Sequence, residues 1–137
     1  MNIDFDDLRR ANIARLPLFK DKQGNIAHSL PDGSDWRPSD WMTAITGETG
    51  ELASFLKSAR RGDFGHLAML CTDGSVHPER MPYDIKSKIA KEIADILIYL
   101  DLLAYQLRLD LGEIVAQKFN EVSERIGVDI QLTGALE

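Results

Sequence analysis

The stretch "KEIADILIYLDLLAYQLRL", residues 91–109, decides the fold of this chain. From Ile93 to Leu107 it is apolar on nearly all sides of a helix, and a helix of that kind is buried on all sides. We expect this helix to begin near Asp84, as its N-cap, and to continue to about Leu109. A four-helix unit of this size does not easily cover such a helix alone, so the pattern predicts a homo-oligomer.

Three more helices are expected outside this stretch. The spacing of apolar residues predicts a first helix over about residues 4–16 and a last one over roughly 111–126. Another is expected to start with Ser39 as its N-cap and to end at about Arg61, where Gly62 follows. The sequence therefore predicts an all-α protein, a bundle of four to five helices.

Two long segments between these helices, residues 17–38 and 62–83, are rich in proline and glycine and are expected to be loops. The tail after residue 126 is expected to be extended or disordered. A loop as long as 62–83 within a compact domain is usually functional or mobile. We expect a single domain over residues 1–137, with 62–83 as a long loop insertion.

The composition, with 44% hydrophobic and 28% charged residues, is typical of a globular protein. The net charge of -6 argues against a nucleic-acid-binding surface, but a local cluster of cations can still bind a small phosphorylated ligand. The N-terminus lacks a signal-peptide pattern, and Asp95, Asp101 and Arg108 interrupt the most apolar stretch, so no membrane span is expected. The single cysteine fits a reducing compartment, so a cytoplasmic location is expected.

Four acidic residues carry the functional signal. In "AITGETGELASFLKSARR", residues 44–61, Glu48 and Glu51 lie three positions apart on or beside the apolar stripe of the helix. Glu92 and Asp95 repeat that spacing on the buried helix, and residues three apart share a helix face. Two such helices packed together gather four negative charges, and burying even one unpaired carboxylate costs several kcal/mol.

A hard divalent cation, Mg²⁺ or Mn²⁺, would offset that repulsion and suits a site made of carboxylates. The acids could instead lie on solvated faces or pair with nearby cations. A di-iron or di-manganese bundle needs Glu-x-x-His pairs, and neither helix contains a histidine. A zinc site made from Cys71, His66 and His77 lacks the further thiol or imidazole that zinc needs. A nucleophilic Cys–His pair among the same residues is equally disfavoured.

Cations near the acids indicate a polyphosphate ligand. Lys118 falls on the apolar stripe of the last helix, Arg125 follows it, and Lys57 lies beyond Glu51 on the second helix. Lysines and arginines near clustered Mg²⁺ sites commonly hold phosphate oxygens. Each of them alone could equally be a surface cation whose stem covers apolar neighbours.

Three further residues are candidates for contacts with a nucleotide base: Asn12, Trp36 and Trp41. Packing in the core or at a subunit interface is the favoured role of the two tryptophans. An exposed position on the first helix is the favoured placement of Asn12.

The motif "GETGEL" at residues 47–52, followed by "EIAD" at 92–95, resembles the E-E-x-x-E … E-x-x-D signature of MazG-like, all-α nucleoside triphosphate pyrophosphohydrolases. The likeness covers about residues 34–130. It implies a helical bundle assembled as a tetramer, or as a dimer, with two or more Mg²⁺ or Mn²⁺ ions bridging the triphosphate. By position it implies these metal ligands: Glu48, Glu51, Glu92 and Asp95. It also implies contacts with phosphate or sugar from Lys118, Asn120 and Arg125.

Two departures from the family pattern stand out. Gly47 replaces the first glutamate of E-E-x-x-E, so any role of that residue in ordering or activating water is missing here. The separation of Glu51 from Glu92 is longer than the resemblance leads us to expect. The excess lies in the 62–83 loop, which is a candidate lid or specificity element.

The expected reaction is metal-dependent hydrolysis of a (deoxy)nucleoside triphosphate to the monophosphate and pyrophosphate. One of Glu48 or Glu51 orients or deprotonates the attacking water. Purine deoxynucleotides such as dGTP or dATP are favoured because Trp36, Trp41 and the long loop leave room for a large base. The alternatives are a non-catalytic helical module that binds a nucleotide or a protein, and a phosphodiesterase-type hydrolase with other products. Neither nucleic acid nor a membrane is an expected partner.

Overall fold

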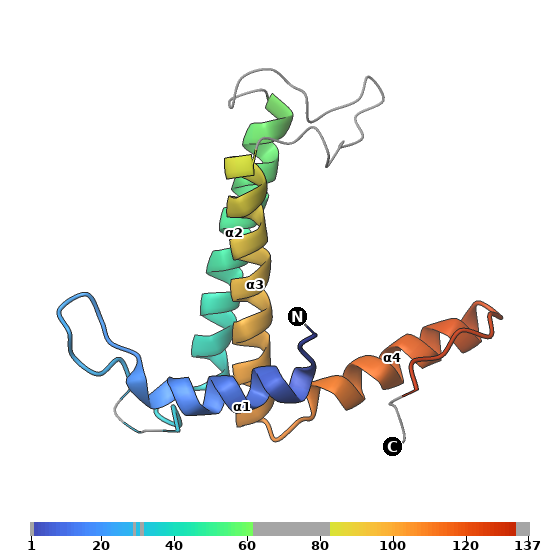
Figure 1. Cartoon of the computed structure of the whole chain (residues 1–137), viewed down its shortest axis with the longest axis horizontal. Coiled ribbons are helices and arrows are strands. Elements are labelled where there is room, and N and C mark those ends of the chain that lie inside the picture. The colour runs from blue at the N-terminus through green and yellow to red at the C-terminus, as the bar shows by residue number, and fades with distance from the viewer. Residues whose placement is uncertain (1, 29, 31, 62–82, 134–137) are drawn as a thin grey trace. The chain divides into compact units, whose positions relative to one another are not determined.

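The computed structural model describes residues 2–28, 30, 32–61 and 83–133 (Figure 1). These residues form four α-helices and one short 3-10 helix, and they contain no strand beyond an isolated bridge between Lys20 and Ile26. The elements in chain order are α1 (Phe5–Arg15), η1 (Leu16–Leu18), α2 (Pro38–Arg61), α3 (Tyr83–Gln106) and α4 (Leu111–Arg125). The prediction of an all-α protein is confirmed.

The chain divides into two compact units. Residues 1–38 and 101–137 form the first unit, and residues 39–100 form the second. Among the described helices, none combines the length and the apolar character needed to cross a membrane. The predicted loop over residues 62–83 lies outside the described residues, apart from Tyr83. His66, Cys71 and His77 belong to this loop and therefore also lie outside the described residues.

Two predicted N-caps are wrong. α2 begins at Pro38, so Ser39 lies inside its first turn, and the Ser39 carbonyl accepts a hydrogen bond from the Thr43 hydroxyl at 2.9 Å. Proline suits a first helical position because no intrahelical partner exists there for an N–H. α3 begins at Tyr83, which places Asp84 in the first turn, where its negative charge complements the helix dipole.

α3 also ends earlier than the sequence predicts, at Gln106 rather than Leu109. Arg108 adopts a left-handed conformation with φ 56°, and the Leu109 N–H bonds back to the Ala104 carbonyl at 2.8 Å. This pattern closes the last turn of a helix. Asp110 then starts α4 by accepting a hydrogen bond from the Glu113 N–H at 2.8 Å.

In the second unit, α2 and α3 lie side by side and antiparallel (Figure 1). Near one end of the pair, the Trp41 and Tyr99 rings are 6.3 Å apart between centroids. Near the other end, the Lys88 ammonium is 5.7 Å from the centre of the Phe55 ring. These two contacts fix the register of the helix pair, and they place the middle of α2 opposite the middle of α3.

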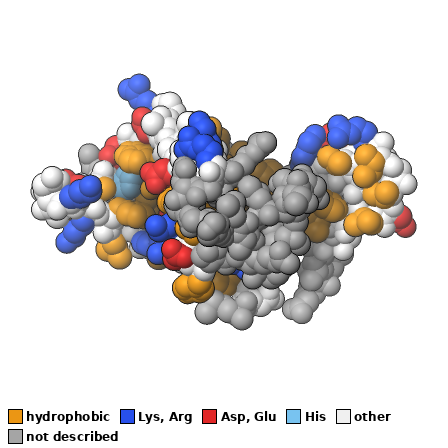
Figure 2. Space-filling model, turned by 90° about the horizontal axis from the view of Figure 1, so that it is seen from above, with side chains coloured by type: hydrophobic (Ala, Val, Ile, Leu, Met, Phe, Trp, Pro, Cys, Tyr) orange, Lys and Arg blue, Asp and Glu red, His pale blue; other side chains and the backbone are white. Residues whose placement is uncertain are grey.

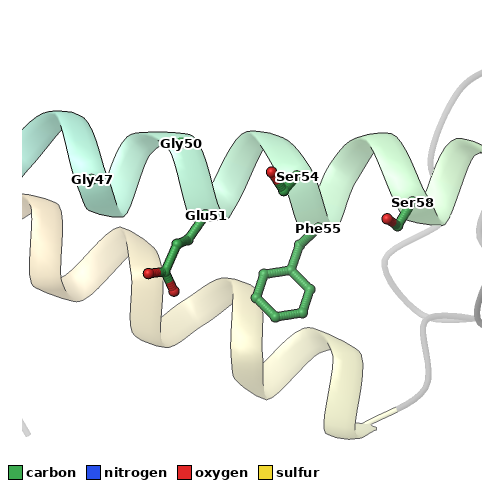
Figure 3. A pocket seen from close by; sticks show the side chains of 6 residues that line it. All are labelled: Gly47, Gly50, Glu51, Ser54, Phe55 and Ser58. Carbon is green, nitrogen blue, oxygen red and sulfur yellow. The ribbon is translucent and has the colours of Figure 1, made fainter.

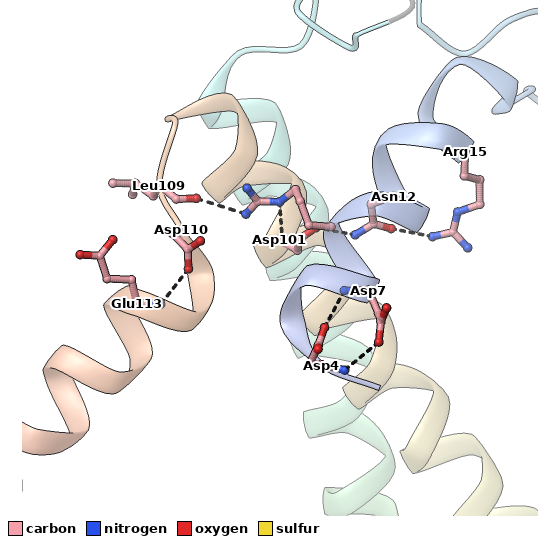
Figure 4. A network of polar contacts seen from close by, with 9 residues as sticks. Asp4, Asp7, Asn12, Arg15, Asp101, Leu109, Asp110 and Glu113 are labelled. Atoms are coloured by element: carbon pink, nitrogen blue, oxygen red, sulfur yellow. Dashed lines mark hydrogen bonds and ion pairs between the residues drawn. The ribbon is translucent and has the colours of Figure 1, made fainter. Parts of the chain in front are cut away.

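In the first unit, a buried carboxylate ties α1 to the last turns of α3 (Figure 4). The Asp101 side chain is completely buried, and its two oxygens accept hydrogen bonds from Arg9 Nε and Asn12 Nδ2, both at 2.8 Å. Arg9 also donates to the Leu109 carbonyl at 3.2 Å, and Arg15 donates to the Asn12 side-chain oxygen at 3.2 Å. A buried charge needs such partners, because an isolated one is strongly unfavourable in a low dielectric.

Replacing Arg9 with Met should therefore destabilise the protein by about 3 kcal/mol, because Asp101 would stay buried without its cation. The control is Arg10→Met. Arg10 pairs with Asp7 on the surface, where its side chain is 69% exposed, and such pairs contribute about 0–1 kcal/mol. Urea denaturation measures both variants, and equal losses would show that the Arg9–Asp101 pair has no special weight.

Candidate functional site

The candidate site is a cluster of carboxylates on α2 and α3. Glu48, Glu51 and Glu92 each offer a carboxylate oxygen, and these oxygens all lie within 4.8 Å of one another. Glu48 and Glu92 are half-buried, whereas Glu51 is exposed. The register of the antiparallel pair brings them together, because Glu48 and Glu51 share one face of α2 and Glu92 lies opposite on α3.

The cluster perturbs the titration of Glu48. Burial raises the pKa of the Glu48 carboxyl above its ordinary value, and a hydrogen bond with the Glu92 side chain raises it further. The negative charges of Asp95, Glu51 and Glu92 act in the same direction. Like charges held this close disfavour the ionised state of the group that is least solvated.

Asp95, the fourth predicted ligand, is exposed and is not one of the three acids that share the 4.8 Å cluster. Its charge nevertheless acts on Glu48, so it lies close to the cluster. The structure thus brings three of the four predicted acids together and places the fourth beside them.

The donor set fits a hard divalent cation. Three carboxylates in close contact supply only oxygen ligands, which Mg²⁺ and Mn²⁺ prefer. The raised pKa of Glu48 shows that the surrounding acids disfavour its negative charge, and a bound cation would offset this effect. Glu48, Glu51 and Glu92 could therefore hold such an ion together, and Asp95 is near enough to assist.

An open pocket of about 440 Å³ adjoins the cluster along α2 (Figure 3). Glu51 and Phe55 line it with four small residues: Gly47, Gly50, Ser54 and Ser58. A Cβ atom added at Gly47 or at Gly50 would meet nothing within 4 Å. The glycine that replaces an expected acid therefore leaves this part of the pocket wall free of any side chain.

The residues predicted to bind phosphate belong to both compact units and differ in their hydrogen-bond and ion-pair partners. Lys57 is exposed on α2, in the same unit as the carboxylates. Lys118 and Arg125 are exposed on α4, in the first unit, and the Lys118 ammonium pairs with Glu121 at 2.6 Å. Asn120 holds the tail, since its side chain exchanges two hydrogen bonds with the Leu132 backbone, at 3.0 and 2.7 Å.

The predicted base contacts lie in different places. Asn12 is only 2% exposed, which corrects the expectation of an exposed side chain, because its amide is needed by the buried Asp101. Trp41 is also 2% exposed, as its favoured role in packing requires. Trp36 is half-buried in the first unit, 5.0 Å from the His28 ring between centroids.

Sequence reasoning missed one residue near the cluster. Lys88 lies four positions before Glu92 on α3, and its ammonium lies over Phe55, which follows Glu51 by four positions on α2. The sequence shows that both pairs, Lys88 with Glu92 and Glu51 with Phe55, are four positions apart. Only the register of the two helices, however, shows that they place Lys88 and Phe55 against each other.

Comparison with known proteins finds one informative likeness. No protein-family model matches the chain. The chain is similar to dCTP pyrophosphatase 1 of Mus musculus, with 28% identity over 100 residues. The match covers 70% of this chain and 52% of the relative, so the chain spans about half the length of the curated relative that it matches.

Glu48→Gln should stabilise the metal-free protein at neutral pH, because it removes one of the repelling charges. A carboxyl whose pKa is raised in the folded state stabilises the fold below its ordinary value of 4.5 and loses that effect as pH rises through the folded-state pKa. In a chelator, the variant should melt above the wild type near neutral pH, and the two should converge as pH falls to about 4.5.

Thermal denaturation at a series of pH values measures this difference. Glu124→Gln, on the exposed surface of α4, is the matched control and should show no such trend. A constant offset between Glu48→Gln and wild type at every pH would contradict the explanation by charge.

Proposed function

We propose that this chain is a metal-dependent nucleoside triphosphate pyrophosphohydrolase. The observation that carries the proposal is the close cluster of Glu48, Glu51 and Glu92, which lies beside an open pocket lined by Glu51. The similarity to a mouse protein named dCTP pyrophosphatase 1 supports the same class of reaction. So does the resemblance of the motifs around these acids to the MazG-like family.

Two or more Mg²⁺ or Mn²⁺ ions would be held by Glu48, Glu51 and Glu92, with Asp95 beside them. When bound, such ions would neutralise the negative charge of the triphosphate and lower the pKa of a bound water. Such ions would also reduce the repulsion that raises the pKa of Glu48.

The other steps belong to side chains of this protein. Glu48 or Glu51 orients the attacking water and accepts its proton, as the water oxygen bonds to the α-phosphorus. The bond from the α-phosphorus to the oxygen that bridges it to the β-phosphorus breaks, and the electron pair leaves on pyrophosphate. Comparing the pH dependence of kcat in Glu48→Gln and Glu51→Gln separates the two candidates for the base, because loss of a metal ligand lowers turnover at every pH, whereas loss of the base also removes the rise of kcat with pH.

The sequence pattern supports contacts with phosphate or sugar from Lys57, Lys118, Asn120 and Arg125. The pocket beside Gly47 is proposed to accept part of the nucleotide. The sequence favours purine deoxynucleotides such as dGTP or dATP, whereas the name of the mouse relative directs attention to dCTP. A panel of the common NTPs and dNTPs, with products resolved by chromatography, decides the base, the sugar and the bond cleaved.

With Mg²⁺ or Mn²⁺, the purified protein should release pyrophosphate and a monophosphate from at least one member of that panel. Glu92→Gln or Asp95→Asn should lower this turnover by at least about 100-fold, because each removes a negative ligand from the metal site. Circular dichroism should show an unchanged helical content. Full turnover in both variants would overturn the assignment of the site.

Metal titration distinguishes the enzyme from a non-catalytic helical module. A metal site that relieves carboxylate repulsion should stabilise the wild type by about 2.7 kcal/mol at a metal concentration of about 100 times Kd. Glu92→Gln should lose most of this gain. A solvated acidic surface would give no such gain in either protein.

We also propose that the protein is a homo-oligomer, a tetramer or a dimer. On α3, Ile93, Leu97 and Leu100 follow one another at helical spacing and are 54%, 41% and 38% exposed. Hydrophobic side chains also gather on the surface of α4 (Figure 2), where Phe119 is 43% exposed, and Ile126, directly after the helix, is 63% exposed. Contiguous apolar surface of this kind is typical of protein interfaces.

Light scattering should therefore give the mass of two or four chains. Leu97→Lys should shift that mass toward a single chain, because it places a charge in the middle of the α3 stripe. Lys91→Ala, on the exposed surface of the same helix, is the control and should leave the mass unchanged. A wild-type mass equal to one chain would contradict the proposal.

A further inference from the structure

A lysine lies one helical turn from the carboxylate cluster. Lys88 and Glu92 are four positions apart on α3, so they share a face of that helix. The Lys88 ammonium is 5.7 Å from the centre of the Phe55 ring. Phe55 stands in the same relation to Glu51 on α2, and both line the open pocket (Figure 3).

The pocket region therefore has two layers along the helix pair. One layer holds Glu48, Glu51 and Glu92 and is strongly acidic. The other, one turn of about 5.4 Å away, holds Phe55 with the Lys88 ammonium over its ring. A ligand that spans both layers would meet a metal site at one end and a cation at the other.

The contact with Phe55 prepares Lys88 for an anion. Lys88 is exposed, and a free lysine side chain loses up to about 2 kcal/mol of rotamer entropy when it is ordered by a ligand. A cation–π contact of about 0.5–1 kcal/mol at an exposed site offsets part of that loss before the ligand arrives. The ring face attracts the positive charge of the ammonium and does not use up its three N–H donors. An anion can therefore still accept hydrogen bonds from them.

We propose that Lys88, held in place by Phe55, binds the terminal phosphates of the substrate, the part that leaves as pyrophosphate. This inference rests on the proposed function and names the residue that holds the leaving group. As the bond between the α-phosphorus and the bridging oxygen breaks, the electron pair remains on pyrophosphate. The Lys88 ammonium stabilises that added negative charge without giving up a proton.

Lys118, which the sequence names among the residues that contact phosphate or sugar, is the other candidate for this role, and the structure supports it less than Lys88. Lys118 already pairs with Glu121 at 2.6 Å, and it belongs to α4 in the other compact unit. Lys88 shares a unit with the carboxylates, and its aromatic partner lines the same pocket as Glu51.

The test measures binding of inorganic pyrophosphate with Mg²⁺ to the full chain by calorimetry, with a nucleoside monophosphate as the second ligand. Lys88→Ala should bind pyrophosphate about 10- to 100-fold more weakly, as expected for the loss of a hydrogen bond to a charged group. Its affinity for the monophosphate should not change. Lys88→Arg should keep most of the pyrophosphate affinity.

Two further variants separate binding from structure. Lys86→Ala removes an exposed cation two positions away, about 200° around the axis of the same helix, and should leave pyrophosphate binding unchanged. Phe55→Leu keeps an apolar wall but removes the ring, and should weaken pyrophosphate binding by roughly 2- to 5-fold.

The outcomes also separate this inference from the proposed function. If the wild type hydrolyses a triphosphate and binds pyrophosphate, but Lys88→Ala behaves like Lys86→Ala, the role of Lys88 is overturned and the function stands. An equal loss of monophosphate and pyrophosphate affinity in Lys88→Ala would mean a structural role and would also overturn it. If the wild type neither hydrolyses triphosphates nor binds pyrophosphate, the proposed function itself fails.

Discussion

Mutual repulsion among the carboxylates between α2 and α3 is the constraint on which the site depends. The contact of Trp41 with Tyr99 and that of Lys88 with Phe55 mark the register of the two helices, and this register holds Glu48 close to Glu92. Water cannot fully solvate these charges, and the raised pKa of Glu48 records the cost. Proteins keep such unfavourable arrangements mainly where function requires them. The helix pair thus holds like charges close together, an arrangement that a bound cation would stabilise.

α3 also carries a fully buried acid, Asp101, which is paired with a cation instead of lying among like charges. Asp101 is completely buried, yet Arg9 and Asn12 satisfy both of its oxygens from within the same compact unit. It works as a structural tie, and the chain itself supplies its counter-charge. Glu92, on the same helix, faces other carboxylates instead. The identity of the partners, and not burial alone, therefore distinguishes Asp101, which is paired with a cation, from Glu92, which lies among like charges.

Much of the helical pattern could be predicted because it depends on local signals. α1 and α4 begin and end within about a residue of their expected bounds, since Asp4 and Asp110 cap them by local hydrogen bonds. The start of α2 was misplaced because Pro38 takes the first helical position, which places Ser39 inside the first turn instead of at the N-cap. The end of α3 was misplaced because Arg108 adopts a left-handed conformation. This conformation is uncommon for a residue other than glycine, so the sequence does not predict it.

By itself, the sequence determined the helices and the spacing of the acids, because both follow from a period of 3.6 residues per turn. It also predicted that Glu48, Glu51, Glu92 and Asp95 would come together, and the first three share one cluster in the structure. Only the tertiary structure decided which long-range partners each side chain meets: Phe55 for Lys88, Asp101 for Asn12 and the Leu132 backbone for Asn120. These contacts depend on the register between helices and on how the chain returns on itself. Periodicity along one helix carries no information about either.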